Sequence, residues 1–250
     1  MTGHAETSMA PLILTEPERP SWGFAEVFLA AAVFLAAFGI VAWVANSYLH
    51  APAQSGLWSV LEEAAGYTIL FLVLKLMFVR YGRGKTQGLL EALGWSKPGP
   101  FTPATLVTIG VVLAVVVAVL ERVLLTPEVD TPFEKLLADP GSRIAVALFG
   151  ITAAPVVEEL LFRGFLQPVL TSAIGVLPGI LVTSALFGAL HLTQNAMIWQ
   201  SGALIMLVGF VLGMVRHVSG STRASSIVHA AYNFLPFVVL LVDGNPLSKK

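Results

Sequence analysis

The chain has 250 residues, of which 56% are hydrophobic and only 12% are charged. Soluble domains carry about 25% charged residues, so this composition argues against one water-soluble domain and indicates helices that span a bilayer. The net charge of −1 offers no basic surface, which argues against nucleic acid as a partner. The absence of cysteine excludes disulfides, thiolate ligands and cysteine nucleophiles.

The hydrophobic residues fall into long segments. Residues 1–21 are polar and interrupted by prolines, lack the basic start and cleavage site of a signal peptide, and are expected to form a cytoplasmic tail. The segments that follow are each long enough to cross a hydrocarbon core of roughly 30 Å. We therefore expect an all-α, polytopic membrane helix bundle with about seven transmembrane helices, within a range of six to eight. The predicted spans are 22–49, 57–80, 104–125, 143–170, 178–199, 201–217 and 223–243.

These spans divide into an N-terminal group over 22–125 and a core over 143–243, and the charges of the loops predict their orientation. The connection 80–100 is mainly basic and the connection 126–142 mainly acidic, so the positive-inside rule places the first in the cytoplasm and the second outside. We expect a bacterial plasma-membrane protein with a cytoplasmic N-terminus. Within the basic connection, 86–95 predicts a short interfacial helix with its leucines toward lipid.

Three charged residues lie close together where charge is least expected. Glu158, Glu159 and Arg163 occur in the apolar stretch PVVEELLFRGF of the fourth predicted span. An ionised group at the bilayer centre costs on the order of 2.5–3.5 kcal/mol, so such groups persist when they are paired or face a wet interior. Glu159 and Arg163 have the i, i+4 spacing of a helical ion pair. Glu158 then points about 100° away, which suits a carboxylate that accepts a proton during catalysis.

Two later spans carry further polar groups. Phe187 and His191 lie in SALFGALHL, and His229 and Asn233 share one helical face in SSIVHAAYNF. Each histidine alone would be read as a hydrogen-bonded core residue, and Glu159–Arg163 alone as a structural bracket. Because three helices each supply acid–base or ligand-forming groups, we favour a shared site.

The remaining charges and histidines have simpler interpretations. Charges near the ends of the second and third spans are expected to be interfacial, and the other histidines lie in the tail, a loop or a turn. The interfacial residues are Glu62, Glu63, Lys75, Glu121 and Arg122, and the other histidines are His4, His50 and His217.

Familiar catalytic motifs such as HExxH, GxSxG and the P-loop are absent. The patterns that are present are EExxxR, FxxxH and HxxxN, in that order. At these residues the chain resembles the CPBP family of type II CAAX prenyl endopeptidases and bacteriocin-processing or abortive-infection membrane proteins. The resemblance extends over about 143–235 and implies an all-helical intramembrane endopeptidase.

That resemblance implies roles for the motif residues. Glu158 would be the general base, activating water with help from His191. His229 and Asn233 would hydrogen-bond the developing oxyanion. Glu159 and Arg163 would support the site by orienting the base or by binding a substrate carboxylate, and Phe187 belongs to the same supporting set.

The cofactor stays open at this level. Glu158, His191 and His229 are also acceptable zinc ligands with room for a water. We prefer water activation without a metal, because an arginine beside a dication is electrostatically unfavourable. The expected partners are the lipid bilayer and a membrane-associated protein or peptide substrate, with a prenylated CAAX tail as one option. The alternatives are a non-enzymatic membrane scaffold or bacteriocin-immunity protein with the same fold, and a transporter that relays protons.

Overall fold

The computed structural model describes residues 20, 22–48, 55–80, 88–127 and 129–243. Almost all of the cytoplasmic tail predicted for 1–21 lies outside these residues. The described part of the chain is helical throughout, so the predicted all-α bundle is confirmed. The helices are α1 (Phe24–Ser47), α2 (Gly56–Arg80), α3 (Leu89–Ala92), α4 (Pro103–Val123), α5 (Pro132–Leu136), α6 (Pro140–Ile151), α7 (Ala153–Glu159), the π-helix η2 (Leu160–Leu166), α8 (Gln167–Ile174), α9 (Val176–Leu190), α10 (Trp199–Ser219) and α11 (Thr222–Asp243).

Among the described residues, five helical segments are long and apolar enough to cross a membrane. They correspond to five of the predicted spans, and the continuous segment from α6 to α8 forms one of them. The other two predicted spans correspond to α9, which has 15 residues, and α11, which has 22 residues and carries serine, histidine and asparagine. Both pack within the bundle. The helices thus form a polytopic membrane protein.

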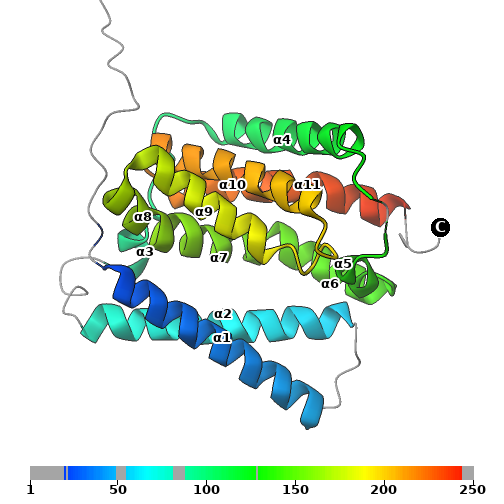
Figure 1. Ribbon diagram of the computed structural model, residues 1–250, viewed down its shortest axis with the longest axis horizontal. Coiled ribbons are helices and arrows are strands. Elements are labelled where there is room, and N and C mark those ends of the chain that lie inside the picture. Colours follow the sequence, from blue (N-terminus) through cyan, green and yellow to red (C-terminus); the bar gives the residue numbers. More distant parts are fainter. Residues whose placement is uncertain (1–19, 21, 49–54, 81–87, 128, 244–250) are drawn as a thin grey trace, which may run out of the picture.

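The bundle has a separate helix pair on one side. Figure 1 shows α1 and α2 as a pair below the rest, and α2 joins this pair to the rest of the bundle by packing against α6. On the opposite side α4 packs along α11. Leu113 of α4, Val208 of α10 and Val228 of α11 belong to the apolar core on that side. The segment α7–η2 lies between the two sides, and it carries the buried charges.

The fourth predicted span, 143–170, is not one regular helix. The chain bends at Thr152, which ends α6 and precedes α7, and η2 follows directly after Glu159. Pro155 lies in the first turn of α7, where its missing N–H removes few helical hydrogen bonds. A π-helical turn widens the backbone spiral and is often found at functional sites. Here it lies immediately after the two glutamates.

The fifth predicted span, 178–199, also ends earlier than expected. Helix α9 stops at Leu190, and His191 is its C-terminal cap. Ala196 and Met197 have φ values of 53° and 59°, a left-handed conformation that does not continue a helix. His191 therefore lies at a helix end and not within a continuous span.

Two loops that are far apart in the sequence contact each other. Thr222 donates its backbone N–H to the carbonyl of Gly94 at 2.9 Å, and the Ser221 hydroxyl donates to the carbonyl of Ser96 at 2.7 Å. These contacts place the connection after α3 against the turn between α10 and α11. The expected lipid-facing position of the leucines holds only in part: Leu90 is exposed, but Leu93 is buried in the protein core.

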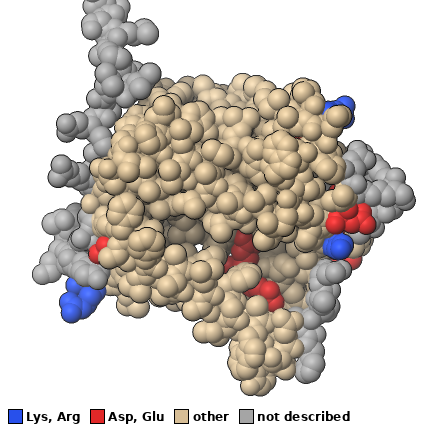
Figure 2. Space-filling model, viewed as in Figure 1, with Lys and Arg blue, Asp and Glu red and all other residues tan. Residues whose placement is uncertain are grey.

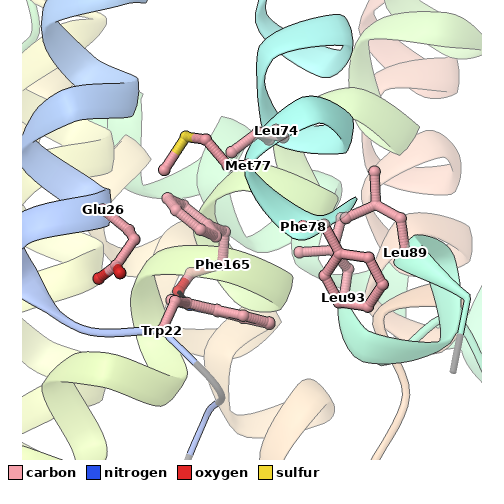
Figure 3. A pocket seen from close by; sticks show the side chains of 8 residues that line it. All are labelled: Trp22, Glu26, Leu74, Met77, Phe78, Leu89, Leu93 and Phe165. Atoms are coloured by element: carbon pink, nitrogen blue, oxygen red, sulfur yellow. Dashed lines mark hydrogen bonds between the residues drawn. The ribbon is translucent and has the colours of Figure 1, made fainter. Parts of the chain in front are cut away.

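The end of α2, α3 and η2 pack around an aromatic pair near the start of α1. The Trp22 ring stacks on Phe165 with centroids 5.3 Å apart, and its indole N–H donates to the Phe165 carbonyl at 2.9 Å. Figure 3 shows this pair beside Leu93 and Met77 around a small cavity. Its volume is about 20 Å³, room for about one water molecule. This cavity is therefore too small to hold a substrate.

Candidate active site

The motif residues converge in the interior of the bundle. Glu159 is fully buried and accepts a hydrogen bond at 2.9 Å from Nη1 of Arg163, the i, i+4 pair expected from the spacing. The same carboxylate oxygen accepts from Nδ1 of His229 at 3.1 Å. Since Glu159 receives both a guanidinium and an imidazole, it is committed to holding α7, η2 and α11 together.

Arg163 is held on every side by protein. Its Nη2 donates to the carbonyl of Gly209 on α10 at 2.9 Å, and its guanidinium carbon lies 4.5 Å from the centre of the Phe187 ring. One turn later, Gln167 donates to the carbonyl of Gly213 at 3.1 Å. Gly209 and Gly213, which are one turn apart on α10, thus provide backbone acceptors for two polar side chains that are four residues apart.

Glu158 differs from Glu159 in exposure and in partners. Its side chain retains 15% of its accessible surface, against 0% for Glu159. Its Oε2 lies 3.9 Å from Nε2 of His229, whose Nδ1 already faces Glu159. His229 therefore lies between the two carboxylates, and Glu158 is the one that solvent or substrate can reach.

His191 enters the cluster through the aromatic ring of Phe187. The Phe187 carbonyl lies 2.7 Å from Nδ1 of His191, and a carbonyl can only accept a hydrogen bond, so Nδ1 carries the proton. The Nε2 of a neutral His191 is then a free lone pair that can accept a proton from water. Phe187 also contacts the His229 ring edge-on, with centroids 5.8 Å apart. Phe187 is thus the packing element between the two histidines and Arg163.

Asn233 lies on the same face of α11 as His229 but has a different partner. Its Nδ2 donates to the carbonyl of Gly150 in α6 at 2.7 Å. This hydrogen bond fixes the amide next to the break between α6 and α7. An amide has two N–H donors, so one remains for a ligand.

A second pair of residues was not expected at the site. Glu63 and Tyr67 lie on α2, and the Tyr67 hydroxyl donates to Oε1 of Glu63 at 2.6 Å. Glu63 interacts electrostatically with both Glu158 and His191. The sequence predicted Glu63 to be interfacial; in the structure it is half-buried and is bound by Tyr67, whose ring stacks on Phe149 of α6. The i, i+4 spacing of Glu63 and Tyr67 was the available sequence signal.

A groove runs along α2 beside these residues. Its volume is about 490 Å³, and α2, α6 and α7 provide most of its walls through residues that include Tyr67, Phe149 and Val157. In the space-filling view a hollow between the lower helix pair and the rest of the bundle contains acidic side chains (Figure 2). Val157 belongs to α7, the helix that also carries Glu158, so the groove runs beside the helix of the buried cluster.

The proposed zinc ligands do not form a metal-binding set. Within the described residues, no three His, Asp or Glu side chains are grouped so that they could hold a metal ion. A zinc ion requires its ligand atoms at about 2.0–2.2 Å from one point. Here the two ring nitrogens of His229 face Glu158 and Glu159, and the Arg163 guanidinium binds the same Glu159 oxygen as His229. Since Glu158, His191 and His229 do not fit a zinc ion in this arrangement, we derive no reaction step through a metal.

The fold and the cluster define a polytopic helical membrane protein with carboxylates, histidines and an arginine in its interior. Residues 140–235 match the family described as Type II CAAX prenyl endopeptidase Rce1-like. This match confirms the family resemblance for that segment, and at the family level it supports a CAAX-protease-like membrane endopeptidase. Comparison with curated proteins and comparison with solved structures each gave no match.

Proposed function

We propose that this protein is an intramembrane endopeptidase that hydrolyses a peptide bond of a membrane-associated protein or peptide. The observation that carries the proposal is the contrast between the two adjacent glutamates. Glu159 is enclosed and bound by Arg163 and His229, while Glu158 is accessible and faces the unoccupied side of His229. This division gives one carboxylate a structural role and leaves the other for proton transfer.

The proposed mechanism begins with a water molecule between Glu158 and Nε2 of His191. Glu158 takes a proton from the water as its oxygen forms a bond to the scissile carbonyl carbon. The carbonyl oxygen becomes an oxyanion, which accepts hydrogen bonds from the remaining N–H of Asn233 and from Nε2 of His229 when that nitrogen carries a proton. The carbon–nitrogen bond then breaks, and Glu158 returns its proton to the leaving amine.

The surrounding residues position these groups. Arg163 and Phe187 fix Glu159 and the histidine rings, and the hydrogen bond to Phe187 fixes the His191 tautomer. Asn233 is fixed by the Gly150 carbonyl. The preorganised dipoles then require little rearrangement as charge develops in the transition state.

The substrate class that we propose is a membrane-associated chain with a CAAX-type end. The test uses purified protein in liposomes with two internally quenched peptides, one with a prenylated CAAX end and one with the same sequence unprenylated. We expect cleavage by the wild type and loss of at least 100-fold in kcat for Glu158→Gln, because a general base contributes 10²- to 10⁴-fold. The variant should keep the wild-type melting temperature within a few degrees.

Three results would contradict parts of this proposal. Full activity of Glu158→Gln would remove the general base and favour the non-enzymatic scaffold, which needs the fold and no turnover. Failure of the wild type to cleave either peptide would exclude the CAAX-type substrate. Loss of activity on chelation with recovery on adding zinc would overturn the metal-free mechanism.

A further inference from the structure

The α2 helix contributes a wall to the candidate active site from outside the segment that matches the family. The match covers 140–235, whereas Glu63 and Tyr67 belong to α2, Gly56–Arg80. Tyr67 lines the same groove as Val157, which precedes Glu158. The groove-lining positions of α2 recur at helical spacing from Ala64 to Lys75, so one face of this helix runs along the groove.

The Glu63 carboxylate is held in a defined position. The Tyr67 hydroxyl donates to its Oε1 at 2.6 Å. The Tyr67 ring is itself buried and stacks on Phe34 of α1, at 6.1 Å between centroids, and on Phe149 of α6, at 6.3 Å. Because the tyrosine is fixed on two sides, Glu63 keeps one orientation, with its second oxygen left to accept another hydrogen bond.

The chemistry of a bound peptide indicates what Glu63 can accept. A peptide whose bond is to be cleaved must be unwound at that point, and its backbone N–H groups then lose their helical partners. Within a membrane little water is present to replace them, so the site itself must supply acceptors. An ionised carboxylate is an acceptor only. Tyr67, which binds Glu63, lines the groove together with Ala153 and Val157 of α7, so the Glu63 carboxylate lies next to the groove. The electrostatic influence of Glu63 on Glu158 and His191 agrees with that position.

We propose that Glu63, held by Tyr67, is a substrate-binding residue that accepts a hydrogen bond from a main-chain N–H of the peptide next to the scissile bond. This assignment rests on the proposed endopeptidase function. It makes the groove between α2 and α6–α7 the place where the unwound peptide lies. Tyr67 is a positioning residue, since it acts through Glu63.

The test compares steady-state kinetics of Glu63→Gln, Tyr67→Phe and the double variant on the quenched prenylated CAAX peptide in liposomes. The matched control is Glu62→Gln, the same change one residue earlier and about 100° away around the helix. Glutamine keeps a neutral acceptor oxygen but loses the charge that strengthens the hydrogen bond. We therefore expect KM for Glu63→Gln to rise about five- to ten-fold, with kcat changed less than about three-fold. We expect a smaller rise for Tyr67→Phe and wild-type kinetics for Glu62→Gln.

The double variant separates positioning from general destabilisation. Because Tyr67 acts through Glu63, Tyr67→Phe should add nothing once Glu63 is glutamine, so the double variant should match Glu63→Gln. Additive effects, an unchanged KM, or a loss confined to kcat would each overturn the assignment. Melting temperatures of all four variants identify any that are misfolded. Glu63→Asp keeps the charged acceptor, so its KM should lie closer to the wild-type value than that of Glu63→Gln.

Failure of this assignment is distinguishable from failure of the proposed function. If Glu158→Gln is inactive while Glu63→Gln has a wild-type KM, only the role of Glu63 is wrong. If Glu158→Gln remains active, the proposed mechanism itself fails. Binding of the same peptide to the Glu158→Gln variant, measured by fluorescence, provides a readout without turnover. Adding Glu63→Gln should weaken this binding about five- to ten-fold, and adding Glu62→Gln should leave it unchanged.

Discussion

Replacing Arg163 by methionine tests how the buried charges hold the bundle together. The substitution keeps an unbranched side chain of similar reach against Phe187 but removes the guanidinium. It breaks the 2.9 Å hydrogen bond to Glu159 and the 2.9 Å hydrogen bond to the Gly209 carbonyl. Both Arg163 and Glu159 have 0% side-chain exposure, so Glu159 would be left as a buried carboxylate with His229 as its remaining partner.

The expected loss of stability follows from this burial. Removing one partner of a buried ion pair typically costs about 3–5 kcal/mol, because the other charge stays buried and uncompensated. For a chain of this size, 1 kcal/mol corresponds to about 2–4 °C in melting temperature, so the expected decrease is on the order of 10 °C. The assay is thermal unfolding in a mild detergent, with Arg122→Met, at an exposed position in the last turn of α4, as the control.

The double variant Glu159→Gln/Arg163→Met makes the reasoning refutable. Since it removes the stranded charge, it should regain at least half of the stability lost by Arg163→Met, although activity should not return. A melting temperature of Arg163→Met within about 2 °C of the wild type would show that the pair contributes little. A double variant as unstable as the sum of the two single variants would show that the residues are not coupled.

Two other predictions concern packing and helix capping. In Gly209→Ala, the added Cβ would lie 3.2 Å from the Ser184 backbone, so we expect α9 and α10 to separate slightly. The melting temperature and the rate of peptide cleavage should both fall. Unchanged values would show that the interface between these helices can adjust. At the start of α6, hydrogen bonds from Ser142 lower the pKa of the Asp139 carboxyl. The stabilising effect of ionised Asp139 is therefore fully present above the unfolded-state pKa of about 3.9. This effect is lost as the pH falls through the lower folded-state pKa. Thermal unfolding of Asp139→Asn should therefore show a constant deficit at pH 6–8 that shrinks below about pH 4, and a deficit independent of pH would contradict the cap.

Several features of the site could be predicted because they depend on local spacing. Glu159 and Arg163 are four residues apart, and the structure pairs them at 2.9 Å. The FxxxH spacing separates Phe187 and His191 by about one helical turn, and their rings lie 4.6 Å apart. Helical periodicity is encoded in consecutive residues, so these contacts within one helix need no knowledge of the rest of the fold.

Other features could not be predicted from local spacing. The bend at Thr152 and the π-helical turn at Leu160–Leu166 divide a segment whose hydrophobic pattern suggests one continuous helix. The position of Glu63 near the end of an apolar segment suggests an interfacial residue. Only the packing of α2 against α6 shows that Glu63 and Tyr67 lie beside the helices of the site. Which helices become neighbours depends on side-chain packing between segments far apart in sequence.

The sequence by itself determined that this protein belongs in a membrane and that its few intramembrane charges form one candidate site. A chain with 12% charged residues cannot cover a soluble surface, and charge within lipid is too costly to be scattered. Spacing already paired Glu159 with Arg163 and left Glu158 without a helical partner. Only the tertiary structure decided their exposure and the position of His229 between them, because these are properties of the assembled bundle: Glu159 is enclosed by Arg163 and His229, and Glu158 remains accessible.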